Sequence, residues 1–146
     1  TMKNGKAFGL YLEEVARTVA EAKALPALAG CAARLEEAVE LQKTVTGSLV
    51  GYALKGEVDR FLSDATLYLE MAGTVCIAWQ WLMQGVVAQR ALDAGAAGDG
   101  RTFLEGKLFT MRYYFEYELP AVDGLARRLS SADAVTIEIG TEHFDD

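Results

Sequence analysis

The side chains that could do chemistry are few, and histidine is the scarcest of them. His143 is the only histidine of the 146 residues and lies three residues from the end, in an acidic segment. A Ser or Cys nucleophile usually needs a histidine base, and a di-iron bundle needs Glu-x-x-His on each of two helices. We therefore predict no catalytic residue and no metal site in this chain, and we interpret His143 as a solvated tail residue.

The two cysteines do not suggest a redox or metal centre. Cys31 and Cys76 lie far apart in apolar stretches without a Cys-x-x-Cys spacing, which predicts small buried side chains in the reduced state. A disulfide between them stays an alternative, because it requires two helices to present both residues at the same height. Reduced thiols are typical of an intracellular protein, so we expect a cytoplasmic location.

Other motifs also lack the context that chemistry requires. Gly95, Gly98 and Gly100 have neither a preceding strand nor a following Lys-Ser or Lys-Thr, so residues 94–100 are predicted to be a flexible loop between helices rather than a phosphate-binding loop. The adjacent carboxylates Glu13-Glu14 and Glu36-Glu37 point in different directions on a helix, which indicates solvated faces. No cofactor-binding residue is predicted in this chain.

Aromatic side chains are dense in the second half. Helical spacing favours core or interface packing for them, although stacking on a planar cofactor is an alternative. They are Trp79, Trp81, Tyr113, Tyr114, Phe115 and Tyr117.

Because a charge inside an apolar stretch is usually paired, we expect an ion pair between Glu70 and Lys107 or Arg112 on different helices.

The net charge of −7 argues against nucleic acid and anionic lipid as partners. The only basic pair, Arg127-Arg128, lies near the end of a helical pattern, where cations complement the helix dipole. Alanine and leucine are frequent and only two prolines occur, which favours long helices.

The apolar periodicity predicts four such helices, over residues 4–24, from Pro26 to Leu54, over 58–93, and from about 101 to 129 with a kink or break at Pro120. The sequence therefore predicts an all-α fold, a four-helix up-and-down bundle over residues 1–130 with a short C-terminal tail.

The predicted helix 58–93 has no charged residue between Glu70 and Arg90. That length approaches a transmembrane span, but the stretch contains three glutamines and has charged flanks. A helix that is apolar all round can equally be central in a bundle or lie at an interface. We favour burial against protein and expect no membrane insertion.

The tail, residues 131–146, loses the helical pattern. Val135, Ile137 and Ile139 alternate with polar residues as in a short strand, but no second strand is available to pair with it. We expect an extended or short helical segment that packs on the bundle, followed by a disordered acidic end over 142–146.

Several stretches of the second half together resemble a known family. They cover roughly residues 60–130, and the first two helices fit the family only in length and pattern. The stretches are Tyr68-Leu69-Glu70-Met71-Ala72-Gly73-Thr74-Val75, Trp79-Gln80-Trp81, Phe103-Leu104-Glu105-Gly106-Lys107-Leu108, Arg112-Tyr113-Tyr114 and Leu119-Pro120. This pattern resembles the C-terminal helical domain of long bacterial acyl-CoA dehydrogenases of the methylmercaptopropionyl-CoA dehydrogenase type. Gly106 departs from it, since alanine is usual there.

The resemblance implies that flavoenzyme domains precede this chain in a longer protein, and that this protein is a homo-oligomer that binds FAD and an acyl-CoA thioester. In the family, a glutamate base and the flavin oxidise acyl-CoA to enoyl-CoA, but no residue of this chain matches the catalytic or FAD-binding positions. Thr1 precedes Met2, and we interpret Thr1 either as an added residue or as the result of an internal cut of that longer protein.

Two other functions stay open. The chain could be a free-standing helical interaction module without an enzyme, or a membrane-associated helical protein. The leading interpretation is an accessory C-terminal domain of an FAD-dependent acyl-CoA dehydrogenase, with a structural or oligomerisation role.

Overall fold

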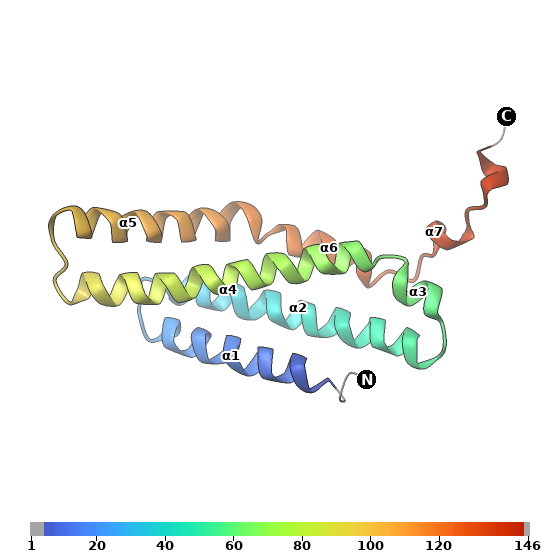
Figure 1. Ribbon diagram of the computed structural model, residues 1–146, viewed down its shortest axis with the longest axis horizontal. Coiled ribbons are helices and arrows are strands. Elements are labelled where there is room, and N and C mark those ends of the chain that lie inside the picture. The colour runs from blue at the N-terminus through green and yellow to red at the C-terminus, as the bar shows by residue number, and fades with distance from the viewer. Residues whose placement is uncertain (1–4, 145–146) are drawn as a thin grey trace.

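Long helical segments lie side by side along the length of the computed structural model, which describes residues 5–144 (Figure 1). The first three are α1 (Lys6–Lys23), α2 (Ala29–Leu54) and α4 (Ala65–Asp93), with the short α3 (Val58–Leu62) before α4. The fourth consists of α5 (Gly98–Tyr113), the π-helix η1 (Tyr114–Glu118) and α6 (Ala121–Leu129). The prediction of an all-helical chain is confirmed over the described residues.

Helices α2 and α4 hold the two outer segments together. α1 packs on both α2 and α4, α5 packs on α4, and α6 packs on both α2 and α4. The finer expectation, a four-helix up-and-down bundle over residues 1–130, stays a prediction.

The core follows the predicted apolar stripes. In α1, Val15 and Val19 are buried, whereas Phe8 and Leu12 of the same stripe are half-buried. The largest fully buried side chains come from α2, α4, α5 and η1 and from the turn before α2, and each contributes about 1.5–3 kcal/mol by leaving water. They are Phe115, Leu28, Leu35, Met71, Leu82 and Met111.

Gly85 lets α5 approach α4 closely. A Cβ atom added at Gly85 would overlap the sulfur of Met111, which is itself buried in α5. Any side chain larger than hydrogen would push the two helices apart or force Met111 out of its position.

Two predicted helix boundaries are wrong. The second helix begins at Ala29 rather than Pro26, because Leu25 to Leu28 form a turn in which Leu28 N–H donates to the Leu25 carbonyl at 2.9 Å. The predicted helix 58–93 is divided after Leu62, and α4 begins at Ala65 after Asp64. Ser63 and Asp64 are residue types that compete with helical backbone bonds and favour helix starts, and the ion pair of Asp64 with the distant Arg128 holds the break in place.

The predicted loop 94–100 is shorter than expected. α5 already begins at Gly98, and the carboxylate of Asp99 in its first turn stabilises this helix start by its interaction with the positive end of the helix dipole. The loop is therefore limited to residues 94–97, where Gly95 has a φ of 93°, a left-handed conformation that favours glycine.

The break predicted at Pro120 is confirmed. α6 begins at Ala121, and before Pro120 the helix widens into η1, where Leu119 N–H donates to the Tyr114 carbonyl five residues earlier at 2.9 Å. Arg127 and Arg128 lie in the last turn of α6, as predicted.

The tail leaves the end of the helical body and extends away from it (Figure 1). It forms the single turn α7 (Val135–Glu138) and the 3₁₀ turn η2 (Thr141–His143), and no strand occurs in its described residues. Val135 and Ile139 are 55% and 45% exposed, so the expectation that this segment packs on the bundle is wrong. Asp145 and Asp146, the end of the predicted disordered segment 142–146, lie outside the described residues, as do Thr1 and Met2.

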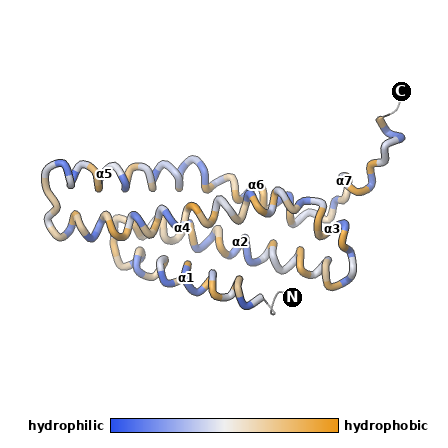
Figure 2. The backbone as a smooth tube through the Cα atoms, in the orientation of Figure 1, coloured by the Kyte–Doolittle hydropathy of each residue, from blue (hydrophilic) through white to orange (hydrophobic). Residues whose placement is uncertain are grey.

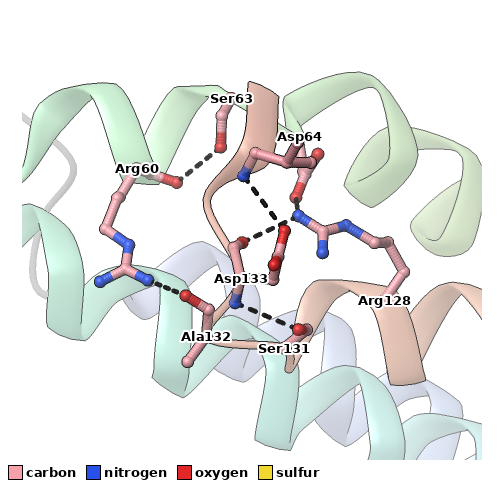
Figure 3. Close-up of polar contacts among 8 residues, drawn as sticks. Arg60, Ser63, Asp64, Arg128, Ser131, Ala132 and Asp133 are labelled. Carbon is pink, nitrogen blue, oxygen red and sulfur yellow. Dashed lines mark hydrogen bonds and ion pairs between the residues drawn. The ribbon is translucent and has the colours of Figure 1, made fainter. Parts of the chain in front are cut away.

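A polar junction holds the base of the tail (Figure 3). Arg128 of α6 pairs with Asp64 at 2.9 Å and also donates to the Asp133 carbonyl at 3.2 Å. Arg60 of α3 donates to the Ala132 carbonyl. The same residues thus join the α3–α4 turn, the end of α6 and the start of the tail.

Candidate interface

The outward side of α4 is apolar, although α4 also supplies much of the core. Leu69 and Val87 are 69% and 67% exposed, and Ile77 and Met83 are 49% and 41% exposed. On the opposite side of the same helix Met71, Val75 and Leu82 are fully buried. Hydrophobic residues accordingly recur along the whole of α4 (Figure 2). We call its exposed side the outer stripe: Leu69, Gly73, Ile77, Gln80, Met83 and Val87.

The burial predicted for this helix is therefore correct for one side only. α4 is long and apolar enough to cross a membrane by length and composition, a property that core helices of soluble proteins share. The signal that the sequence reasoning missed is a second apolar stripe on the far side of the helix from the core stripe.

A groove of about 350 Å³ runs beside the outer stripe, between α4 and α5. Met83, Val87 and Phe103 give it apolar walls, and Gln80, Gln84 and Lys107 give it polar edges. We call it the α4–α5 groove.

Lys107 is held in the α4–α5 groove by neutral partners. Its Nζ donates to Gln84 Oε1 at 3.1 Å and lies 5.5 Å from the Trp81 ring centre and 5.4 Å from that of Phe103. Such cation–π contacts stabilise an ammonium group without neutralising it. Lys107 thus keeps a positive charge available at the edge of an apolar surface.

An aromatic ridge follows the outward side of α5 and η1. It consists of Phe103, Phe109, Tyr113 and Tyr117, each more than half exposed. The rings of Tyr113 and Tyr117 stack, with centres 4.7 Å apart. Exposed aromatic side chains at this density are typical of protein contact surfaces.

The predicted aromatic group is divided between core and surface. Phe115 is fully buried, and Trp79, Trp81 and Tyr114 are half-buried, whereas Tyr113 and Tyr117 lie on the ridge. Trp79 Nε1 donates to Thr18 Oγ1 of α1 at 2.8 Å, and Tyr114 OH donates to the Thr74 carbonyl at 3.2 Å.

The predicted ion pair of Glu70 with Lys107 or Arg112 is wrong. Within residues 5–144 neither cation lies within pairing distance of Glu70, because Lys107 faces Gln84 and Arg112 lies over the Phe109 ring. The pairs that do join separate helices are Arg34–Glu116 at 2.6 Å, Arg90–Glu21 at 2.9 Å and Lys23–Glu36 at 2.7 Å.

The remaining reactive side chains do not assemble. Cys31 and Cys76 are free thiols, and burial raises the pKa of the Cys31 thiol, which disfavours the reactive thiolate. His143 is exposed in η2. Among the described residues, no three His, Cys, Asp or Glu side chains come together as metal ligands would.

A partly buried polar network joins α1, α2 and α4. Tyr11 OH donates to Oε1 of the buried Gln42 at 3.1 Å, and Thr46 Oγ1 lies 2.8 Å from Tyr68 OH. Burial, together with the neighbouring Cys76, raises the pKa of Tyr11 far above its ordinary value of about 10. The phenol of Tyr11 is therefore a structural hydrogen-bond donor that stays protonated.

This raised pKa predicts a loss of stability at high pH. Above pH ~10 the unfolded chain releases the Tyr11 proton while the folded chain keeps it, so the free energy of unfolding falls as the pH rises. Tyr11→Phe should be less stable at pH 7 by about 1 kcal/mol but show a shallower decline between pH 10 and 12. Urea unfolding at each pH measures both effects. Equal declines in the two proteins would show that Tyr11 ionises as easily in the fold as in the unfolded chain.

The chain is similar in sequence to known proteins. A protein family described as acetyl-CoA dehydrogenase C-terminal like matches residues 11–140. The chain is 27% identical over 117 residues to the broad-specificity linear acyl-CoA dehydrogenase FadE5 of Mycobacterium tuberculosis. That similarity covers 77% of this chain but 19% of the relative, so the chain spans about a fifth of the length of the curated relative it matches.

Proposed function

This chain belongs to the acetyl-CoA dehydrogenase C-terminal-like family, the C-terminal domains of acyl-CoA dehydrogenases, and from that premise we propose that it is the accessory domain of an FAD-dependent enzyme that oxidises acyl-CoA to enoyl-CoA. In this proposal the domain stabilises the enzyme or its oligomer and does no chemistry. Its partners are the preceding domains of a longer chain and further copies of itself, in the cytoplasm and without membrane insertion or nucleic acid.

The observation that carries this proposal is the combination of a large apolar outward surface with dispersed reactive groups. The outer stripe and the aromatic ridge present eight large hydrophobic side chains to solvent on α4, α5 and η1: Leu69, Ile77, Met83, Val87, Phe103, Phe109, Tyr113 and Tyr117. Monomeric proteins rarely expose extended apolar patches, which mark contact sites. A domain with this contact surface, and with no assembled reactive groups among residues 5–144, fits a structural role.

We propose that the described residues of this chain do not hold the FAD. Its diphosphate would need free backbone N–H groups and a cation, and the glycine-rich turn before α5 is the nearest resemblance to such a site. Asp99 lies in the first turn of α5, and Arg101 is paired with Glu105 at 2.8 Å, so this helix start opposes an anion. We therefore assign the flavin, the acyl-CoA and the reaction to the domains that would precede this chain.

The intact protein tests the proposal. We expect the full-length enzyme to show flavin absorbance and acyl-CoA dehydrogenase activity, and a form cut before α1 to keep its flavin spectrum. The cut form should lose several degrees of melting temperature or its oligomeric mass, because it lacks the apolar contacts of this domain.

Three other outcomes would count against the proposal. A cut form that stays folded and flavin-bound but cannot turn over substrate would place this domain at the active site. A full-length protein without flavin would remove the enzyme assignment. A chain with nothing encoded before Met2 would favour the free-standing interaction module.

A further inference from the structure

We propose that the outer stripe of α4 is a two-fold interface through which two copies of this chain pair, with their α4 helices antiparallel. The inference deepens the oligomerisation role proposed above and rests on that part of it. Its test uses this chain without any flavoenzyme, so the two proposals fail separately.

The first step is the spacing of the outward residues. Six of them, five residues of the outer stripe and the half-buried Cys76, are spaced alternately by four and three positions along α4, the heptad spacing of helices that pack along a seam. These six residues, which we call the seam, are Leu69, Gly73, Cys76, Gln80, Met83 and Val87, and Ile77 of the outer stripe lies on their flank. A helix that packs only within its own domain needs one apolar side, whereas α4 has a second with the regularity of a packing seam.

The second step is the symmetry of this seam. Leu69 and Val87 are equally far from Ala78 along the helix, as are Gly73 and Met83, and Cys76 and Gln80. An antiparallel pair centred at Ala78 would place Leu69 against Val87 and Gly73 against Met83 of the second copy. A two-fold interface must be self-complementary in this way.

The pairing also matches side-chain sizes. A Cβ atom built on Gly73 meets nothing within 4 Å, so the surface there is open to the long, flexible Met83 side chain of the second copy. A parallel pair would instead place Gly73 on Gly73 and Met83 on Met83. That arrangement leaves a void at one level and crowding at another.

The third step is charge. Glu70 and Gln84 each directly follow a seam residue, Leu69 and Met83, so they lie on the same flank of the seam. In the antiparallel pair, Glu70 would lie beside Gln84 of the second copy, and Lys107 is bonded to Gln84. Lys107 and Glu70, which do not pair within one chain, would then pair twice across the axis.

The acidic character of the chain favours the same face. With a net charge of −7, two copies repel each other over most approaches. Between Glu70 and Arg90 α4 carries no charge, and the cation nearest to it in the groove is Lys107. Here two copies can meet with little repulsion and with complementary groups at the edge.

Cysteine cross-linking tests the register. In a background with Cys31 and Cys76 replaced by serine, we would prepare Leu69→Cys and Val87→Cys separately and mix them under a mild oxidant. The two positions lie about 27 Å apart along one helix, so an antiparallel pair brings together only unlike positions. We expect disulfide-linked dimers from the mixture and none from either variant alone, with unchanged circular dichroism because both sites are exposed.

A charge swap tests the edge contact. Glu70→Lys should weaken dimerisation roughly tenfold in sedimentation equilibrium, because two pairs become repulsive. Adding Lys107→Glu should restore the affinity. Glu13→Lys, the same charge change on an exposed site of α1, serves as the control and should not weaken dimerisation.

Several results would overturn the inference. They are dimers from either cysteine variant alone, a mixture that stays monomeric, and a charge swap without recovery. A chain that is monomeric at 100 µM, roughly a concentration at which weak contacts form, but floats with phospholipid vesicles would assign the stripe to a membrane. A monomer that binds only the separately produced flavoenzyme domains would assign it to those domains.

Discussion

Val75→Asp should unfold this chain, because Val75 is fully buried in the middle of α4. An aspartate there has to lose its hydration or take up a proton, and the apolar contacts of valine are lost as well. We expect a loss of at least ~4 kcal/mol, comparable with the whole stability of a small domain. Circular dichroism and urea unfolding measure the effect.

Ile77→Asp is the matched control. It introduces the same carboxylate two residues further along α4, where the side chain is 49% exposed. The charge can remain hydrated there, so we expect the helical signal to survive. Trp79→Asp should fall between the two, since Trp79 is half-buried and bonded to Thr18. A Val75→Asp protein with the wild-type melting temperature would show that this side of α4 is not in the core.

Phe115→Ala should give the second largest loss, about 3–5 kcal/mol. Phe115 is fully buried in η1, and its removal leaves a cavity where η1 packs on α4. Because the π-helix has no regular α-helical bonds to keep its shape, the surroundings depend on this side chain for their packing. Chemical unfolding at neutral pH measures the change.

Tyr117→Ala serves as the control in the same π segment. Tyr117 is 72% exposed, so the change should stay within about 0.5 kcal/mol. Equal losses for the two variants would mean that the π-helix itself, rather than the buried ring, determines the stability of this region.

Periodicity predicted the helices well because burial and helical repeat coincide in them. Val15 and Val19 lie in the core as their spacing indicates, and Pro120 separates η1 from α6 because proline lacks the N–H group that a continuous helix needs. The family resemblance covered roughly residues 60–130, within the stretch 11–140 that the family match covers.

Boundaries that depend on tertiary contacts could not be predicted. The turn at Ser63-Asp64 is fixed by the bond between Asp64 and Arg128, residues far apart in the sequence. The ion pair predicted for Glu70 was wrong for a similar reason, because Lys107 contacts Gln84 and two aromatic rings rather than a carboxylate.

For the candidate site, the feature that the sequence did not predict is the exposure of the outer stripe. The sequence of an uncharged helix is the same whether its second side packs within its own domain or against a partner, so composition alone cannot distinguish the two. Only the positions of α1 and α5, on the two flanks of α4, show that Leu69 and Val87 are left uncovered.

The two tryptophans of α4 are placed to act as separate optical reporters. Trp79 contacts α1 through Thr18, whereas Trp81 lies beneath Lys107 of α5. Replacing either one with phenylalanine leaves a single tryptophan, whose emission follows the contact of α4 with α1 or with α5. Stopped-flow fluorescence on the two variants would therefore show which of these contacts opens first when the domain unfolds.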